Sequence, residues 1–173
     1  DANSSNYSFT HNLNLSVGLS IEDFETNSFY AYPWTMDGNT DWIIETADTY
    51  EGVYSARSGE IDDGEESILS VSVEVISVSD ISFAYKVSSE SGYDLLNFYI
   101  DGVLQDNWSG TTQWATATYP VTIGNHNFTW AYRKDGSSNN GSDCGWIDYI
   151  IFPTISALPS SDISIDPSSF SEN

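Results

Sequence analysis

Apolar and polar residues alternate along several stretches of this chain. Over residues 68–75, Leu69, Val71, Val73 and Val75 fall on one face, and the other face carries serines and a glutamate. The same two-residue period recurs over 81–87, 96–100 and 128–132. This period is typical of half-buried β-strands. We therefore expect strands at these positions, and no helix longer than roughly ten residues, because β-branched and serine-rich segments disfavour helices.

Turn residues separate the alternating stretches. Asp101-Gly102 lies between an apolar run that ends at Ile100 and another that begins at Val103, which predicts a tight type I′ hairpin. Similar signals recur every ~8–12 residues, a spacing typical of an all-β sandwich or jelly roll. The pattern alone leaves these two topologies open.

Both ends of the chain differ in composition from its middle. Residues 1–20 are rich in Ser and Asn, and the stretch after Phe152 is rich in Ser and Pro. A length of 173 residues suits one domain with a real core. We expect a leader, linker or edge strand at 1–20, a single module at 21–155, and a linker into a following domain at 156–173.

The charge balance narrows the possible partners. The chain has 26 acidic and 4 basic residues, with a net charge of −22. This charge repels phosphate backbones and anionic lipid, so we expect neither nucleic acid nor membrane insertion. Solubility is the first explanation for the acidity, and carboxylate ligands for calcium are the second. The single cysteine, Cys144, cannot form an intrachain disulfide, which suits a secreted bacterial protein better than an extracellular animal domain.

Several blocks of sequence carry a family resemblance. They are DFE at 23–25, Trp42, TYEGVYSARSG at 49–59, SFAYKVSSE at 82–90, YDLLNFYIDG at 93–102, WAYRKDG at 130–136 and DCGWIDYI at 143–150. In this order they resemble the MAM-like, cleaved-adhesin (choice-of-anchor type) jelly-roll modules that are attached to secreted bacterial proteins. The resemblance covers roughly residues 22–153. It implies a two-sheet antiparallel jelly-roll sandwich, secreted or at the cell surface, whose first and last strands lie close together.

The resemblance also implies a structural calcium ion where those strands meet. By position, Asp23 or Glu25 and Asp148 would supply carboxylates, and the turn at Ser58 would supply backbone oxygens. Without a metal, Asp23 and Glu25 would cap a turn and Asp148 would be an outward strand residue. The acidic loops 37–41 and 62–66 also offer carboxylates, but we favour solvated turns there.

The aromatic residues suggest a ligand. The chain has 6 Trp and 11 Tyr, and sugar rings stack on flat aromatic faces while amides and carboxylates bond their hydroxyls. Candidate ligand-binding residues are Trp108 and Trp114 with Asp106 and Gln113, and a second cluster with Tyr32 and Trp34. Core packing is the competing interpretation and is favoured for Trp108 and Trp114. We expect Trp130 and Trp146 to fill the core between the sheets.

Catalysis finds little support in the sequence. The two histidines are His11 and His126, the latter in a predicted turn, and neither belongs to a Ser/His/Asp or Cys/His arrangement. Cys144 reads as a small buried residue. We therefore expect no enzyme, but an accessory binding or adhesion module of a secreted multidomain bacterial protein, stabilised by calcium. Its expected partners are extracellular glycan or protein and the neighbouring domains of its own parent chain. The alternative is a structural spacer with no ligand other than calcium.

Overall fold

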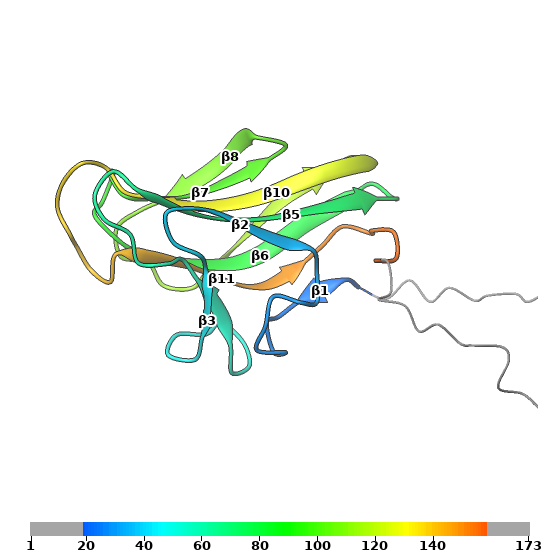
Figure 1. The fold of residues 1–173 in the computed structure, drawn as a ribbon. Helices are drawn as coiled ribbons and strands as arrows, with labels where there is room; N and C mark the ends of the chain where they lie inside the picture. The colour runs from blue at the N-terminus through cyan, green and yellow to red at the C-terminus, as the bar shows by residue number, and fades with distance from the viewer. Residues whose placement is uncertain (1–18, 159–173) are drawn as a thin grey trace, which may run out of the picture.

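A computed structural model describes residues 19–158, so the leader predicted at 1–20 and the linker predicted at 156–173 lie almost wholly outside the described residues. Residues 19–158 form two antiparallel sheets that pack face to face, without a helix between them (Figure 1). The predicted all-β, two-sheet sandwich is therefore confirmed.

The strands divide between a six-stranded and a five-stranded sheet. The six-stranded sheet has the order β3 (Ile43–Glu45), β4 (Ser55–Arg57), β11 (Cys144–Ile151), β6 (Ser79–Ser88) and β9 (Ala115–Val121), with β1 (Ile21–Glu22) also paired to β11. The five-stranded sheet has the order β2 (Trp34–Gly38), β5 (Glu66–Val75), β10 (Gly124–Arg133), β7 (Leu95–Ile100) and β8 (Val103–Trp108). Because β6 occupies one side of β11, β1 and β4 share the other side, and the first and last strands are direct neighbours.

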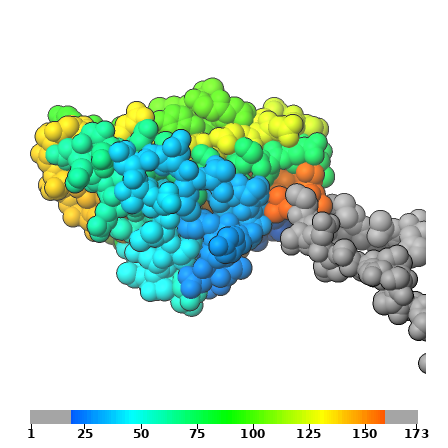
Figure 2. Space-filling view, in the orientation of Figure 1, coloured from blue at the N-terminus to red at the C-terminus, as the bar shows by residue number. Residues whose placement is uncertain are grey.

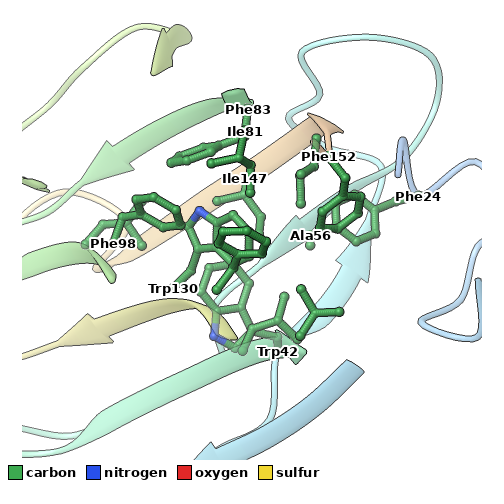
Figure 3. Packing of buried hydrophobic residues seen from close by; sticks show 14 of the residues in the cluster. Phe24, Trp42, Ala56, Ile81, Phe83, Phe98, Trp130, Ile147 and Phe152 are labelled. Atoms are coloured by element: carbon green, nitrogen blue, oxygen red, sulfur yellow. The ribbon is translucent and has the colours of Figure 1, made fainter. Parts of the chain in front are cut away.

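The core lies between the sheets and follows the alternation in the sequence. The four inward-facing apolar residues of β5, Leu69, Val71, Val73 and Val75, are at most 5% exposed, and β5 pairs with β10 over its whole length. Trp130 of β10 is fully buried at the centre (Figure 3). Its ring lies 5.0 Å from that of Phe98 and 5.2 Å from that of Phe83, which comes from the opposite sheet. Aromatic rings from both sheets thus contact one another in the middle of the core.

The predicted hairpin joins β7 to β8. Asp101 and Gly102 have φ angles of 53° and 75°, as a type I′ turn requires. The Asp101 carboxylate accepts the backbone N–H of Asn127 (2.8 Å) and bonds His126 Nδ1 (2.7 Å). The prediction of a solvated turn at His126 is wrong, because this half-buried residue belongs to β10.

A β-bulge in β11 decides what the outer face of the six-stranded sheet carries. The register between β6 and β11 shifts between Asp148 and Ile151, and Tyr149 has a φ of 46°, which a non-glycine residue seldom adopts. Ile147 and Ile150 are both in the core. The two residues between them, Asp148 and Tyr149, are therefore both free to face outward.

Trp146 is buried, but not between the sheets as expected. It neighbours the inward-facing Ile147 and so points to the outer face, where the Lys86 ammonium lies 5.3 Å from its ring centroid. Its indole N–H donates to Glu45. Strand alternation is the reason: two successive strand residues cannot both enter the core.

Candidate functional site

A shallow hollow of about 250 Å³ lies on the outer face of the six-stranded sheet; we call it the outer-sheet hollow. Its lining includes four small side chains of β6 and β9, Ser82, Ala84, Thr116 and Thr118. Tyr50, Tyr149 and Ile151 also line it. Small residues on the strands leave room above the sheet, and the larger rings stand at the side.

Three aromatic rings gather beside the outer-sheet hollow. The ring of Tyr50 lies 5.9 Å from that of Trp114 and 6.4 Å from that of Tyr149. Tyr50 is 45% exposed, and the other two are half-buried. The indole N–H of Trp114 donates to Asp48 Oδ1 (2.8 Å), and the other oxygen of Asp48 pairs with Lys86. The Trp114 ring is therefore held in one orientation, with charged and polar groups beside it.

Asp148 anchors the loop that carries Tyr50. This carboxylate is fully buried; its Oδ2 accepts the N–H groups of Tyr50 (2.9 Å) and Glu51 (3.1 Å), and its Oδ1 accepts that of Tyr149 (2.7 Å). Burial raises the pKa of Asp148 to about 6, against the opposing effect of these N–H donors. Asp148 thus ties the loop that carries Tyr50 to β11.

Glu25 holds the same loop from the other side. Its Oε1 accepts the N–H groups of Val53 (2.7 Å) and Tyr54 (2.9 Å). Gly52 approaches this carboxylate so closely that an added Cβ would lie 2.3 Å from Oε1, and its φ is 64°. Glu25 and Asp148 together clamp the loop between β3 and β4 through four backbone N–H groups.

Of the four predicted calcium ligands, Asp23, Glu25 and Asp148 lie near one another, and Ser58 lies apart from them. The Oδ1 of Asp23 accepts the N–H of Glu25 (3.2 Å). Burial is the main cause of the raised pKa of Asp148, and the nearby Glu25 charge adds to it, while the N–H donors oppose both effects. Ser58 is buried elsewhere: its hydroxyl accepts the N–H of Gly145 (3.1 Å), three residues along β11 from Asp148, which corresponds to roughly 10 Å.

The structure does not bring this set together as the ligands of one calcium ion. Both oxygens of Asp148 and one of Glu25 are engaged by N–H donors. Within residues 19–158, a single group of three potential metal ligands has atoms within 4.8 Å of one another, and none of the four predicted ligands belongs to it. Calcium at Asp23, Glu25, Ser58 and Asp148 stays a prediction.

Of the six predicted ligand-binding residues, Trp114 stands at the outer-sheet hollow. Gln113, which precedes it, is exposed. Trp108 lies elsewhere, half-buried against the core, with its ring stacked on that of Tyr85 at 3.9 Å. Asp106 is exposed and accepts the hydroxyl of Tyr119 (3.3 Å).

Tyr32 and Trp34 pack against the core. The Tyr32 hydroxyl donates to the carbonyl of Ile21 (3.1 Å), and its ring lies 4.7 Å from that of Phe152. The Trp34 indole donates to Glu22 (3.0 Å), a buried carboxylate of β1. Their polar atoms are engaged within the domain, so we do not include them in the candidate site.

Tyr50 and Tyr149 are the functional candidates that the sequence did not reveal. Tyr149 reads as an inward strand residue until the bulge is known. Tyr50 lies in a loop whose place depends on contacts with Asp148, 98 residues further along the chain. No local sequence pattern signals either contact.

A larger hollow, of about 600 Å³, lies at the loop end of the sandwich; we call it the end hollow. Arg57, Lys134 and four acidic side chains, Glu60, Asp62, Glu65 and Asp143, help to line it. Among residues 19–158, no aromatic ring lines it, so this part of the chain gives it no surface on which a sugar would stack.

Cys144 is buried, as expected. Burial raises the pKa of its thiol to about 11, although Arg57 Nε donates to its sulfur (3.2 Å). A thiol in this state is a poor nucleophile. The described residues include no helix long and apolar enough to cross a membrane.

Comparisons with known proteins bear on the fold. No family model matches the chain, and no curated protein matches it. Among solved structures, it is similar to TmCBM61, solved in complex with β-1,4-galactotriose, with a TM-score of 0.54, 20% identity, and coverage of 75% of this chain and 92% of that one. It is also similar to the K1 cleaved adhesin domain of Lys-gingipain from Porphyromonas gingivalis W83, with a TM-score of 0.58 and 11% identity. This match covers 82% of this chain and 99% of that domain.

A third similar structure is the secreted serine protease VesC from Vibrio cholerae, with a TM-score of 0.57 and 23% identity. The match covers 79% of this chain but 28% of the protease. At these identities the comparisons show that the chain has the β-sandwich fold shared by carbohydrate-binding modules and cleaved adhesin domains.

Proposed function

We propose that this chain is a non-catalytic binding module that holds an extracellular glycan in the outer-sheet hollow. One observation carries the proposal: the rings of Tyr50, Trp114 and Tyr149 gather beside a hollow lined by small side chains. Sugar rings present apolar C–H faces that pack on aromatic rings. The hollow is open, which suits an extended chain better than an enclosed small molecule.

The polar groups nearby suit sugar hydroxyls. Thr116 and Thr118 offer hydroxyls that both donate and accept, and Asp48 and Lys86 lie beside Trp114. The fold that the chain shares with TmCBM61, solved with a galactotriose, supports the proposal as an analogy of architecture.

The test is a titration of soluble polysaccharides and oligosaccharides against the module, followed by calorimetry. Tyr50→Ala and Trp114→Ala should each weaken binding about tenfold, which corresponds to about 1.4 kcal/mol, within the range of one stacked ring. Tyr30→Ala is the matched control, because Tyr30 is 94% exposed and lies outside the hollow. Equal binding by all three variants would contradict the proposal.

We also infer that the module is secreted and belongs with the MAM-like, cleaved-adhesin group. The fold shared with the K1 and K2 cleaved adhesin domains of Lys-gingipain, at 11% and 12% identity, supports this placement. Neighbouring domains of the same parent chain would then be its covalent partners.

A spacer function is the second candidate. Its support is that none of the six tryptophans, all of which lie within residues 19–158, is exposed. A spacer would bind no glycan or matrix protein in a broad screen. Binding that is lost on Tyr50→Ala and kept on Tyr30→Ala would decide against it.

A further inference from the structure

Two loops at the end of the sandwich bring three carboxylates together. Glu90 and Asp94 belong to the loop between β6 and β7, and Asp135 directly follows β10 and Lys134. The backbone N–H of Asp135 donates to Asp94 Oδ1 (2.9 Å), which ties the two loops to each other. We call Glu90, Asp94 and Asp135 the acidic triad. The loop that continues to β11 lies at the far end of the molecule from β1 (Figure 1).

The acidic triad has the spacing of ligands on one cation. One carboxylate oxygen from each residue lies within 4.8 Å of the other two. Oxygens bind calcium at roughly 2.3–2.6 Å, so two ligands of one ion stand at most about 5 Å apart. The three oxygens can therefore share an ion without movement of the backbone.

A second observation points to a ligand at this place. Asp94 is 0% exposed, and its Oδ2 has no hydrogen-bond partner, whereas its Oδ1 is engaged by Asp135. Glu90 Oε2 is likewise buried without a partner. A buried carboxylate oxygen without a donor is costly, and proteins normally supply it with a hydrogen bond or a metal ion.

No basic side chain supplies the missing partner. The nearest candidate is Lys134, whose buried ammonium pairs with Asp143 (2.5 Å) and Asp63 (3.3 Å). None of the ion pairs among residues 19–158 includes a member of the acidic triad. Burial raises the pKa of Asp94, against the opposing effects of the Asp135 N–H and the Lys134 charge, and burial with the neighbouring charges of Asp135 and Asp94 raises that of Glu90. The negative charge here is therefore compensated only in part.

We infer that the acidic triad is a binding site for a hard divalent cation, calcium, which joins the β6–β7 loop to the segment after β10. Three carboxylates on two loops suit calcium, which accepts irregular oxygen coordination, better than magnesium, which demands near-ideal octahedral geometry. The segment after β10 also supplies Asn139, Ser142 and Asp143 to the end hollow. In the space-filling view this segment packs at one end of the molecule beside the residues that precede β5 (Figure 2). A bound ion would thus stabilise one wall of the end hollow.

The experiment is a calcium titration of the chelator-treated chain, followed by calorimetry and by the melting temperature. At about a hundredfold excess over Kd, calcium should raise the melting temperature by roughly 5–10 °C. Asp94→Asn, Glu90→Gln and Asp135→Asn should each remove most of this rise. In chelator, Asp94→Asn should melt at or above the wild-type temperature, because it removes a buried charge whose Oδ2 has no hydrogen-bond donor.

Two controls separate the acidic triad from other acidic groups. Asp62→Asn removes the same charge at the same end of the molecule and should keep the full calcium response. Glu25→Gln alters the site predicted between the first and last strands and should also keep it. If one triad variant fails to fold, the other two still carry the test.

Several results would overturn the inference. They are a wild-type chain that gives neither heat nor a melting shift with calcium, a response that all three triad variants keep, and a response lost on Glu25→Gln. Equal shifts with calcium and magnesium would indicate general screening of the acidic surface and would also overturn it. Glycan binding at the outer-sheet hollow is measured separately, so either proposal can fail alone.

Discussion

The clamp on the loop between β3 and β4 can be tested by adding one methyl group at Gly52. Gly52 has a φ of 64°, so alanine costs about 1 kcal/mol in backbone strain. Its Cβ would lie 2.3 Å from Glu25 Oε1. Glu25 is exposed and flexible, so it will move away, and the N–H groups of Val53 and Tyr54 will lose their charged acceptor. Water can bind these two N–H groups in place of the carboxylate and restores part of the lost stability. The free energy of unfolding should then fall by about 1–2 kcal/mol more, the typical value of such hydrogen bonds.

The matched control is Gly102→Ala in the β7–β8 hairpin. Gly102 has a similar φ of 75°, but an added Cβ would meet nothing within 4 Å. We therefore expect Gly102→Ala to lower the free energy of unfolding by about 1 kcal/mol and Gly52→Ala to lower it by about 2–3 kcal/mol. Urea unfolding with an unchanged slope measures both values.

A double-mutant cycle identifies the cause of the difference. In a Glu25→Ala background, Gly52→Ala should cost about 1 kcal/mol, as at Gly102, because no carboxylate remains to displace. Equal losses for Gly52→Ala and Gly102→Ala in the wild-type background would refute the clamp. They would mean that the Glu25 hydrogen bonds contribute nothing to holding the loop.

Three further predictions concern the hairpin, the core and Trp108. The pKa of Asp101 is lowered because the Asn127 N–H and His126 outweigh the effect of burial. Asp101 should therefore stabilise the fold above its unfolded pKa of about 4 and lose this effect as the pH falls through its lower folded pKa. The advantage over Asp101→Asn should stay below about 0.5 kcal/mol because the Asp101 side chain is 48% exposed. Urea curves from pH 7 to 2 would show it, and an advantage that grew as the pH fell toward 2 would contradict the sign. Phe98→Ala should cost about 3–5 kcal/mol, because this fully buried ring contacts Trp130 and Phe83; thermal melting checks it, and a loss below about 1 kcal/mol would mean a loosely packed core. Trp108→Ala should lower stability by about 2 kcal/mol and leave glycan affinity unchanged, whereas a selective loss of affinity would restore Trp108 to the binding site.

The strands themselves could be predicted from local sequence. Burial of one face of a strand requires an apolar residue at every second position, and residues 68–75 and 128–132 show this period clearly. The hairpin at Asp101-Gly102 could be predicted for a similar reason, since two successive positive φ angles favour this residue pair. Trp146 shows the limit: its size suggested the core, but its place beside Ile147 directed it outward.

The candidate sites depend on contacts between distant residues. Asp135 bonds Asp94 across 41 residues, and Tyr50 bonds Asp148 across 98. Each contact depends on which strands pair and in which register, and a shift of one residue would turn every side chain to the other face. The bulge at Tyr149 is such a local shift, and nothing in the sequence around it announces one.

The sequence by itself therefore determined the all-β class, the strands with their inward faces and the tight hairpin, because these follow from local periodicity and from backbone preferences. Only the tertiary structure decided that the rings of Tyr50, Trp114 and Tyr149 gather beside one hollow and that the carboxylates of Glu90, Asp94 and Asp135 lie together. The physical reason is that strand pairing and register join residues that are far apart along the chain. A ligand site is a property of those pairings rather than of any single segment.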